Sequence, residues 1–75
     1  MRIKKLLGMQ VLDVDANHIG KIEDIEFAQE TGEIEKIFVS LKKNILSNDE
    51  TIIHYDNIKS IGDYVLLKIT INQDE

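Results

Sequence analysis

The chain has 75 residues, of which 43% are hydrophobic and 31% charged, and it contains neither cysteine nor proline. So short a chain forms one small globular domain. Without cysteine, neither a disulfide nor a thiolate metal site can support its core. The formal net charge of -5 disfavours a general affinity for phosphate backbones.

The N-terminal residues begin basic and then apolar, but this apolar run ends at Gly8 and is too short for a signal-peptide core. No segment approaches the roughly 18 continuous apolar residues of a membrane-spanning helix. We therefore expect a cytoplasmic protein without membrane insertion. Residues 1–75 are expected to form a single domain, with a core over about residues 5–71 and a short flexible acidic tail at 72–75.

Apolar residues recur at alternate positions between turn-forming residues, which is typical of short strands. A first strand is predicted over residues 9–13. Residues 15–18 are predicted to form a turn, because Asp and Asn side chains hydrogen-bond to nearby backbone. This pattern favours a mostly β domain.

A second strand is predicted over residues 21–27, with Gly20 opening it. Ile22 and Ile25 lie three residues apart, which breaks the period of two. A β-bulge near residues 23–24 would restore the register and bend the strand.

A hairpin is predicted at residues 30–33, where Gly32 suits the left-handed position of the turn. The strand that follows should therefore pair antiparallel with the second strand. Three of its residues are predicted to face the core: Ile37, Val39 and Leu41. Residues 42–50 are predicted to be a loop.

The C-terminal third is predicted as strand, helical turn and strand. A short strand is expected over residues 51–55, and one helical turn over 56–62, with Asp56 as its N-cap and Gly62 ending it. Residues 64–71 show the clearest alternation, with Val65, Leu67, Ile69 and Ile71 on one face. Tyr64 and Leu66 make the opposite face half apolar, which predicts that another element or a partner covers it.

The chain contains four short motifs, which are in chain order Gly8-Met9-Gln10-Val11 with Asp13, Gly20-Lys21-Ile22-Glu23-Asp24-Ile25, Thr31-Gly32-Glu33-Ile34 and Ile58-Lys59-Ser60-Ile61-Gly62-Asp63. In this order and spacing the chain resembles the PRC-barrel domain family over roughly residues 5–71. The resemblance implies a small antiparallel six-stranded β-barrel that binds other proteins, often as a dimer, without catalysis of its own. Relatives commonly carry proline before an aromatic residue, whereas this chain has His54 before Tyr55.

Asp13, Asp15, Asn17 and Asp24 occupy the first, third, fifth and twelfth positions of a calcium-loop spacing. His18 stands where that loop needs glycine, the twelfth residue is not Glu, and the flanking segments are predicted strands. We interpret the segment as a hairpin turn. Whether the turn formed by Asp13, Asp15 and Asn17 binds any ion stays open.

The residues with catalytic potential form no recognisable motif. His18 and His54 are the only imidazoles and do not have a metal-ligand spacing, and no serine lies in a nucleophile motif. Paired carboxylates such as Glu33 and Glu35 are common on solvated strands. We therefore predict no enzymatic activity, no cofactor and no metal.

The sequence predicts a protein-interaction or adaptor module that self-associates as a homodimer. More apolar residues are present than one small barrel needs to bury, and the interface anchors predicted are Phe38, Tyr64, Leu66 and Leu46. The alternative is an RNA- or ribosome-associated protein, because the family includes part of a ribosome maturation factor. Its predicted basic patch consists of Arg2, Lys4, Lys5, Lys42 and Lys43. The identity of a protein partner is not predicted.

Overall fold

The computed structural model describes residues 1–41 and 49–71. These residues form a short helix, six strands and one 3-10 turn, which are in chain order α1 (Ile3–Leu6), β1 (Gln10–Leu12), β2 (His18–Phe27), β3 (Ile34–Leu41), β4 (Glu50–His54), η1 (Tyr55–Asn57), β5 (Ile58–Ile61) and β6 (Val65–Leu67). The prediction of a mostly β chain with six strands is confirmed. Residues 42–48 and 72–75, and with them most of the predicted loop and the predicted tail, lie outside the described residues.

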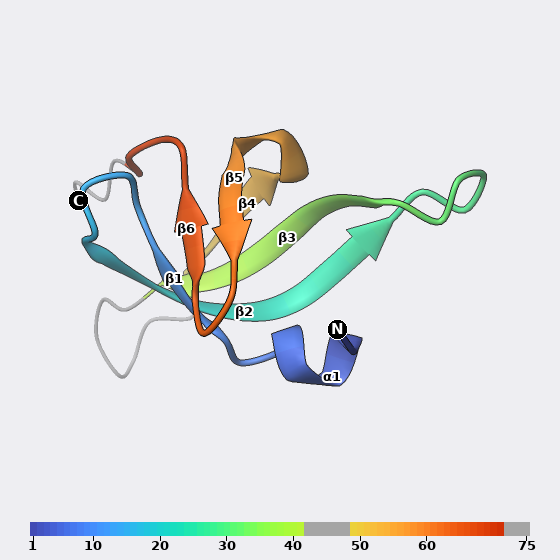
Figure 1. The fold of residues 1–75 in the computed structure, drawn as a ribbon, viewed down its shortest axis with the longest axis horizontal. Helices are drawn as coiled ribbons and strands as arrows, with labels where there is room; N and C mark the ends of the chain where they lie inside the picture. Colours follow the sequence, from blue (N-terminus) through green and yellow to red (C-terminus); the bar gives the residue numbers. More distant parts are fainter. Residues whose placement is uncertain (42–48, 72–75) are drawn as a thin grey trace.

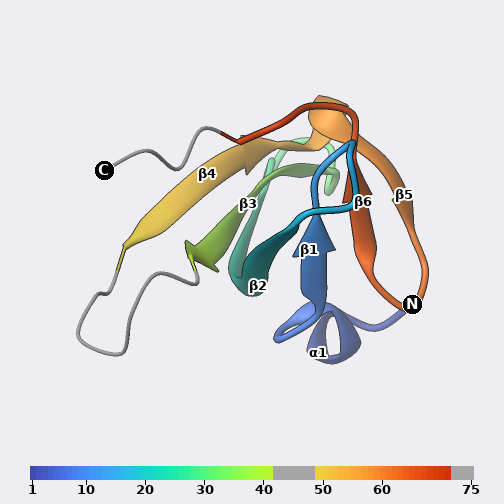
Figure 2. The same ribbon diagram turned by 90° about the vertical axis from the view of Figure 1, so that its left-hand side faces the viewer.

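The six strands form one sheet in the order β4-β3-β2-β1-β6-β5. Four of the five strand pairs are antiparallel, but β1 and β6 run parallel, so the predicted all-antiparallel arrangement is wrong. Hairpins bring strands together antiparallel, whereas β6 reaches β1 only after the chain has crossed from one side of the sheet to the other. The sheet curls strongly, and the described part of the chain leaves β4 and β5 unpaired with each other, so closure into a barrel is not confirmed (Figure 2).

The long strands β2 and β3 bend as they pass through the sheet and then extend beyond it as an arm (Figure 1). The pairing of β2 with β3 shifts between Ile22 and Asp24, which confirms the predicted bulge. The extra residue allows both Ile22 and Ile25 to face the core despite their spacing of three. The arm ends in the predicted hairpin, where Gly32 has a φ of 77° and donates its N–H to the Ala28 carbonyl at 2.7 Å.

Gly20 was predicted to open the second strand, but it lies inside β2, between the two neighbouring strands β1 and β3. It pairs with Val11 of β1 and with Leu41 of β3. A Cβ atom at this position would overlap the backbone carbonyl oxygen of Ser40. The glycine therefore permits a close approach of two backbones within the curled sheet.

The predicted helical turn over residues 56–62 is wrong in extent. Only Tyr55–Asn57 form a 3-10 turn, whose N-cap is His54, and Ile58–Ile61 form the strand β5. Ile58 and Ile61 both pack against the core because the pairing of β5 with β6 shifts between Ile58 and Ser60. A bulge thus produces the spacing of three that the sequence pattern had suggested was helical.

The predicted last strand is also shorter than expected, because β6 ends at Leu67. Beyond it the Lys68 N–H donates to the Asn57 carbonyl at 2.8 Å, and the Ile69 carbonyl accepts from the Val14 N–H at 3.1 Å. Ile69 and Ile71 still pack against the core. An extended segment that crosses the end of a curled sheet shows the same alternation as a strand.

The core fills the concave side of the sheet. Its buried apolar side chains are Leu6, Met9, Val11, Ile19, Ile22, Ile37, Val39, Ile53, Val65 and Leu67. The inward positions predicted for Ile37 and Val39 are confirmed, and Leu41 is half-buried against the same core. Helix α1, which was not predicted from the sequence, contributes Leu6 to this core.

Candidate functional site

The side of the sheet that faces away from the core retains apolar side chains at its β4 edge. On β3, Ile37 and Val39 are buried, so Phe38 between them lies on the opposite face. Phe38 pairs across the sheet with Ile52 of β4, whose side chain is 53% exposed. We call Phe38 and Ile52 the β3–β4 patch.

A second group of apolar residues lies on the outer face at the other side of the sheet. Leu66 lies between the buried residues Val65 and Leu67 and is half-buried. It pairs in parallel with Leu12 of β1. Tyr64, which is 46% exposed, directly precedes β6. We call Leu12 and Leu66 the β1–β6 patch.

The two patches do not form one continuous surface. Strand β2 lies between them in the sheet, and because the sheet curls, the outer faces of β3–β4 and β1–β6 point in different directions (Figure 2). The outward residues between them are polar, as shown by the pairs Gln10 with Lys21 and Lys21 with Ser40. The predicted anchors Phe38 and Leu66 therefore belong to different surfaces, and Leu46 lies outside the described residues.

Carboxylates from two strands meet beside the β3–β4 patch. Glu50 of β4 lies beside Glu23 of β2, and this contact, together with desolvation and the negative charges of Glu23 and Asp24, raises the pKa of the Glu50 carboxyl. The two carboxylates repel each other when both are ionised. A hydrogen-bond donor or a positive charge placed beside Glu23 and Glu50 would therefore reduce this repulsion.

The turn between β1 and β2 is organised by the buried side chain of Asp13. Its Oδ1 accepts hydrogen bonds from the Asp15 N–H at 2.9 Å and the Asn17 N–H at 2.8 Å, and its Oδ2 accepts from Asn17 Nδ2 at 3.2 Å. Burial by itself raises the pKa of the Asp13 carboxyl, but these hydrogen bonds outweigh it and hold that pKa below its ordinary value. The interpretation of this segment as a hydrogen-bonded turn is confirmed, with Ala16 in the left-handed region at a φ of 67°.

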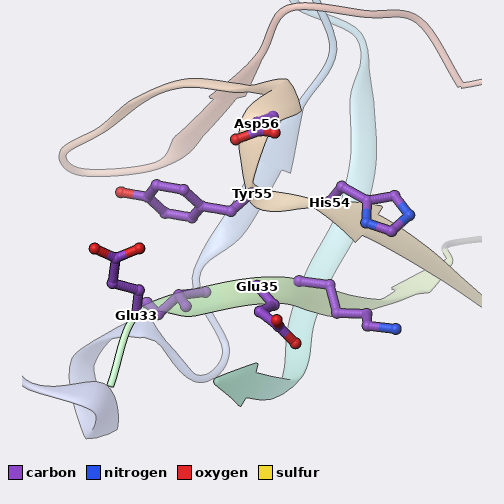
Figure 3. A pocket seen from close by; sticks show the side chains of 7 residues that line it. Glu33, Glu35, His54, Tyr55 and Asp56 are labelled. Atoms are coloured by element: carbon purple, nitrogen blue, oxygen red, sulfur yellow. The ribbon is translucent and has the colours of Figure 1, made fainter. Parts of the chain in front are cut away.

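An open groove of about 390 Å³ lies between the start of β3 and the 3-10 turn η1, where its lining residues are Glu33, Ile34, Glu35, Lys36, His54, Tyr55 and Asp56. In Figure 3 the Tyr55 ring and the Glu33 carboxylate extend to the same side, whereas His54 points the opposite way. The groove was not predicted from the sequence because its two halves are separated along the chain. The pairing of Lys36 with His54 brings them together.

The sequence profile of the family described as PRC-barrel domain matches residues 1–73, nearly the whole chain. The chain belongs to this family. The resemblance noted from the four short motifs is thereby confirmed. No curated protein matches the chain with significance.

The predicted basic patch of this PRC-barrel domain can be located only in part. Arg2, Lys4 and Lys5 are exposed at the N-terminal helix α1, whereas Lys42 and Lys43 lie outside the described residues. Within residues 1–41 and 49–71, no helix has the length and apolar content needed to cross a bilayer.

The two histidines of the PRC-barrel domain lie on different strands. His54 is exposed at the end of β4, and His18 begins β2, where its Nε2 is buried without a hydrogen-bond partner among the described residues. In the same part of the chain, no three His, Cys, Asp or Glu side chains are grouped so that they could hold a metal ion.

Proposed function

We propose that this PRC-barrel domain is a non-enzymatic, cytoplasmic protein-interaction module that self-associates as a homodimer. Membership of the PRC-barrel family supports the proposal. The observation that carries it is the β3–β4 patch, because Ile52 keeps 53% of its surface exposed next to the apolar side chain of Phe38 at an open edge of the sheet. Apolar surface of this kind favours association with a protein.

The β1–β6 patch supplies a second surface for the same function. Leu66 and Leu12 are half-buried, and Tyr64 beside them has a large exposed side chain. Tyrosine is enriched in protein interfaces, because its ring contributes apolar area and its hydroxyl group can remain hydrated. Tyr64 and Leu66 are therefore retained as interface anchors.

Sedimentation velocity over a wide range of protein concentration tests self-association. We expect the wild-type chain to shift from monomer to dimer as the concentration rises, and a lysine at Phe38 or at Leu66 to move the midpoint of that shift to higher concentration. The variant with the larger effect identifies the surface used. A wild-type chain that remains monomeric throughout would refute self-association.

A second candidate function is RNA or ribosome association, which is favoured by the exposed side chains of Arg2, the N-cap of α1, and of Lys4 and Lys5 within α1. Binding through these residues would release counterions, so its affinity would fall steeply with salt. A filter-binding assay at low and moderate salt, with Lys4 and Lys5 replaced by Gln as the comparison, tests it. Absent binding, or binding that does not change with salt, would exclude this function.

A further inference from the structure

Strand β4 is an edge of the sheet. It pairs with β3 on one side, and the described residues place no strand on its other side. Figure 2 shows it as the outermost strand next to β3. The backbone N–H and C=O groups on such an edge are a template for a further strand.

One hydrogen bond identifies the backbone groups of β4 that point away from β3. The Leu41 N–H donates to the Asp49 carbonyl at 3.0 Å, so Leu41 and Asp49 form a hydrogen-bonded pair. Hydrogen-bonded and non-hydrogen-bonded pairs alternate along antiparallel strands, so Thr51 and Ile53 bond to β3 as well. The backbone groups directed to the free edge are therefore those of Glu50, Ile52 and His54.

The side chains of the same three residues share one face. Ile53 is buried in the core at 2% exposure, so Glu50, Ile52 and His54 project from the outer face of the sheet, and all three are exposed. The edge thus presents an acid two residues before an exposed isoleucine and an imidazole two residues after it.

We propose that a second copy of this chain pairs with β4 antiparallel, with Ile52 of both copies on the two-fold axis. This inference rests on the proposed self-association and specifies its surface and register. In this register Ile52 faces its counterpart, and Glu50 of each copy faces His54 of the other. Each of these residue pairs exchanges two backbone hydrogen bonds, so every backbone group that Glu50, Ile52 and His54 direct to the edge is satisfied.

The side chains explain why the occupant is a second copy. In a two-fold interface, if residue i of one copy contacts residue j of the other, then j of the first copy also contacts i of the second. Glu50 and His54 satisfy this condition, because each lies two residues along the strand from Ile52, on opposite sides of it. The imidazole can donate a hydrogen bond to the carboxylate whether it is neutral or charged. Within one copy the Glu50 carboxyl instead contacts Glu23, which raises its pKa.

The neighbouring registers are less favourable. A shift of the axis by one residue keeps edge-directed groups opposite one another but places Ile52 opposite Glu50 or opposite His54. Either arrangement removes the contact between the two isoleucines. It also leaves one of Glu50, Ile52 and His54 without a partner among the same three residues of the other copy. Ile52 and the flanking Glu50–His54 pairs therefore specify one register.

Sedimentation velocity on Ile52→Lys tests the surface. Two lysines would face each other on the axis, and we expect the dimer to dissociate at concentrations on the order of a hundredfold above those of the wild type. The matched control is Ile3→Lys, the same substitution at a residue of nearly equal exposure, 52%, on α1. A wild-type dimer that Ile52→Lys leaves unchanged would overturn this inference and leave self-association through another surface standing. A wild-type monomer at all concentrations would overturn both.

Cysteine cross-linking tests the register without depending on a disruptive variant. The chain has no native cysteine. Under mild oxidation, Ile52→Cys should form a disulfide dimer, whereas Glu50→Cys and His54→Cys should each cross-link poorly alone and readily when mixed, since only unlike positions face each other. Equal cross-linking of Glu50→Cys alone and in the mixture would rule out the register.

Amide hydrogen exchange supplies an internal control within β4. The N–H groups of Glu50, Ile52 and His54 should gain protection of at least about tenfold as the protein is concentrated, whereas those of Thr51 and Ile53 are bonded to β3 at any concentration. A concentration dependence that is the same for both sets would contradict pairing at this edge.

Discussion

Gly20 marks a place where the backbones of β2 and β3 approach closely. The position lacks room for a Cβ atom because the Ser40 carbonyl oxygen occupies that space. Other glycines of the chain differ in this respect. Gly62, in the turn between β5 and β6, has open space within 4 Å of the point where a methyl group would attach. Two glycines of one chain thus have opposite tolerance for the same substitution.

We expect Gly20→Ala to lower the free energy of unfolding by at least about 3 kcal/mol, because a backbone must shift to admit the methyl group. Gly62→Ala is the control and should change stability by less than about 1 kcal/mol. Chemical denaturation of both variants measures the difference. Equal stability of the two variants would mean that β2 and β3 can separate at Gly20 without loss.

Asp13 stabilises the turn between β1 and β2 through hydrogen bonds that its ionised form accepts best. Because the pKa of this carboxyl is lowered in the folded chain from its ordinary value of 3.8, its contribution to stability is present above that value. The contribution is lost as the pH falls through the lower pKa of the folded state. The turn should therefore weaken in acid.

Asp13→Asn should lower the Tm at neutral pH by about 5 °C, and the difference from wild type should shrink as the pH falls below 3.8. Asp15→Asn serves as the control, because the Asp15 side chain takes no part in these hydrogen bonds. Thermal unfolding followed by circular dichroism over a pH series gives the result. A difference that stays constant into acid would remove ionised Asp13 from the explanation.

At the scale of the element, β4 illustrates how one strand serves two purposes. Its buried residue Ile53 anchors it to the core, and its exposed neighbour Ile52 does not. The alternation of inward and outward side chains assigns stability to one residue and surface properties to the next. The same strand also brings Glu50 next to Glu23.

Ile53→Ala should cost about 2–5 kcal/mol of unfolding free energy, because it removes buried methyl groups and leaves a cavity. Ile52→Ala, measured in dilute solution where the chain is monomeric, should cost less than about 1 kcal/mol. Urea denaturation of the two variants makes the comparison. A larger loss for Ile52→Ala would show that the faces of β4 are reversed.

Glu50→Gln should stabilise the monomer at neutral pH. The raised pKa of Glu50 means that its ionised form is disfavoured in the folded state, so its stabilising contribution exists below the ordinary value of 4.5 and is lost as the pH rises through the folded-state pKa. The gain in Tm of Glu50→Gln over the wild type should therefore appear at pH 7 and vanish when the pH is well below 4.5. Glu30→Gln, in the hairpin turn, removes the same charge elsewhere and should give no such pH-dependent gain.

The sequence pattern predicted strands β1 to β4 but not helix α1 or strand β5, and it predicted too long a range for the last strand. A bulge was recognised between Ile22 and Ile25 because clear alternation surrounds it, whereas the same device between Ile58 and Ile61 was mistaken for a helical turn. The groove beside η1 could not be foreseen, because the pairing of Lys36 with His54 depends on the register of β3 and β4. Periodicity describes a segment's faces, but it does not identify the segment's neighbours.

At the scale of the molecule, one core unites helix α1 and all six strands. Buried residues from α1, from β1 and from the C-terminal strand β6 belong to the same cluster, as Leu6, Val11 and Leu67 show. Figure 2 shows the curl of the sheet whose strands contribute these residues. No group of strands in the described chain has a core of its own, so the sheet should unfold as a unit.

We expect a single cooperative transition in urea, with far-UV circular dichroism and the amide signals of Val11 and Ile53 changing at the same midpoint. These residues lie on opposite sides of the sheet order, so they report on both halves. Separate midpoints for Val11 and Ile53 would show that the β4 side can open independently of β1 and β6.

The parallel contact between β1 and β6 has a consequence for how the molecule is made. Val11 of β1 pairs with Val65 of β6, which is synthesised more than fifty residues later, so this part of the sheet cannot be completed until β6 has been made. During synthesis the early hairpin of β2 and β3 can form on the ribosome, while β1 keeps one side open until the last strand emerges. Foreign strands would compete for that open side in this interval, so assembly should be most vulnerable to aggregation before β6 has emerged.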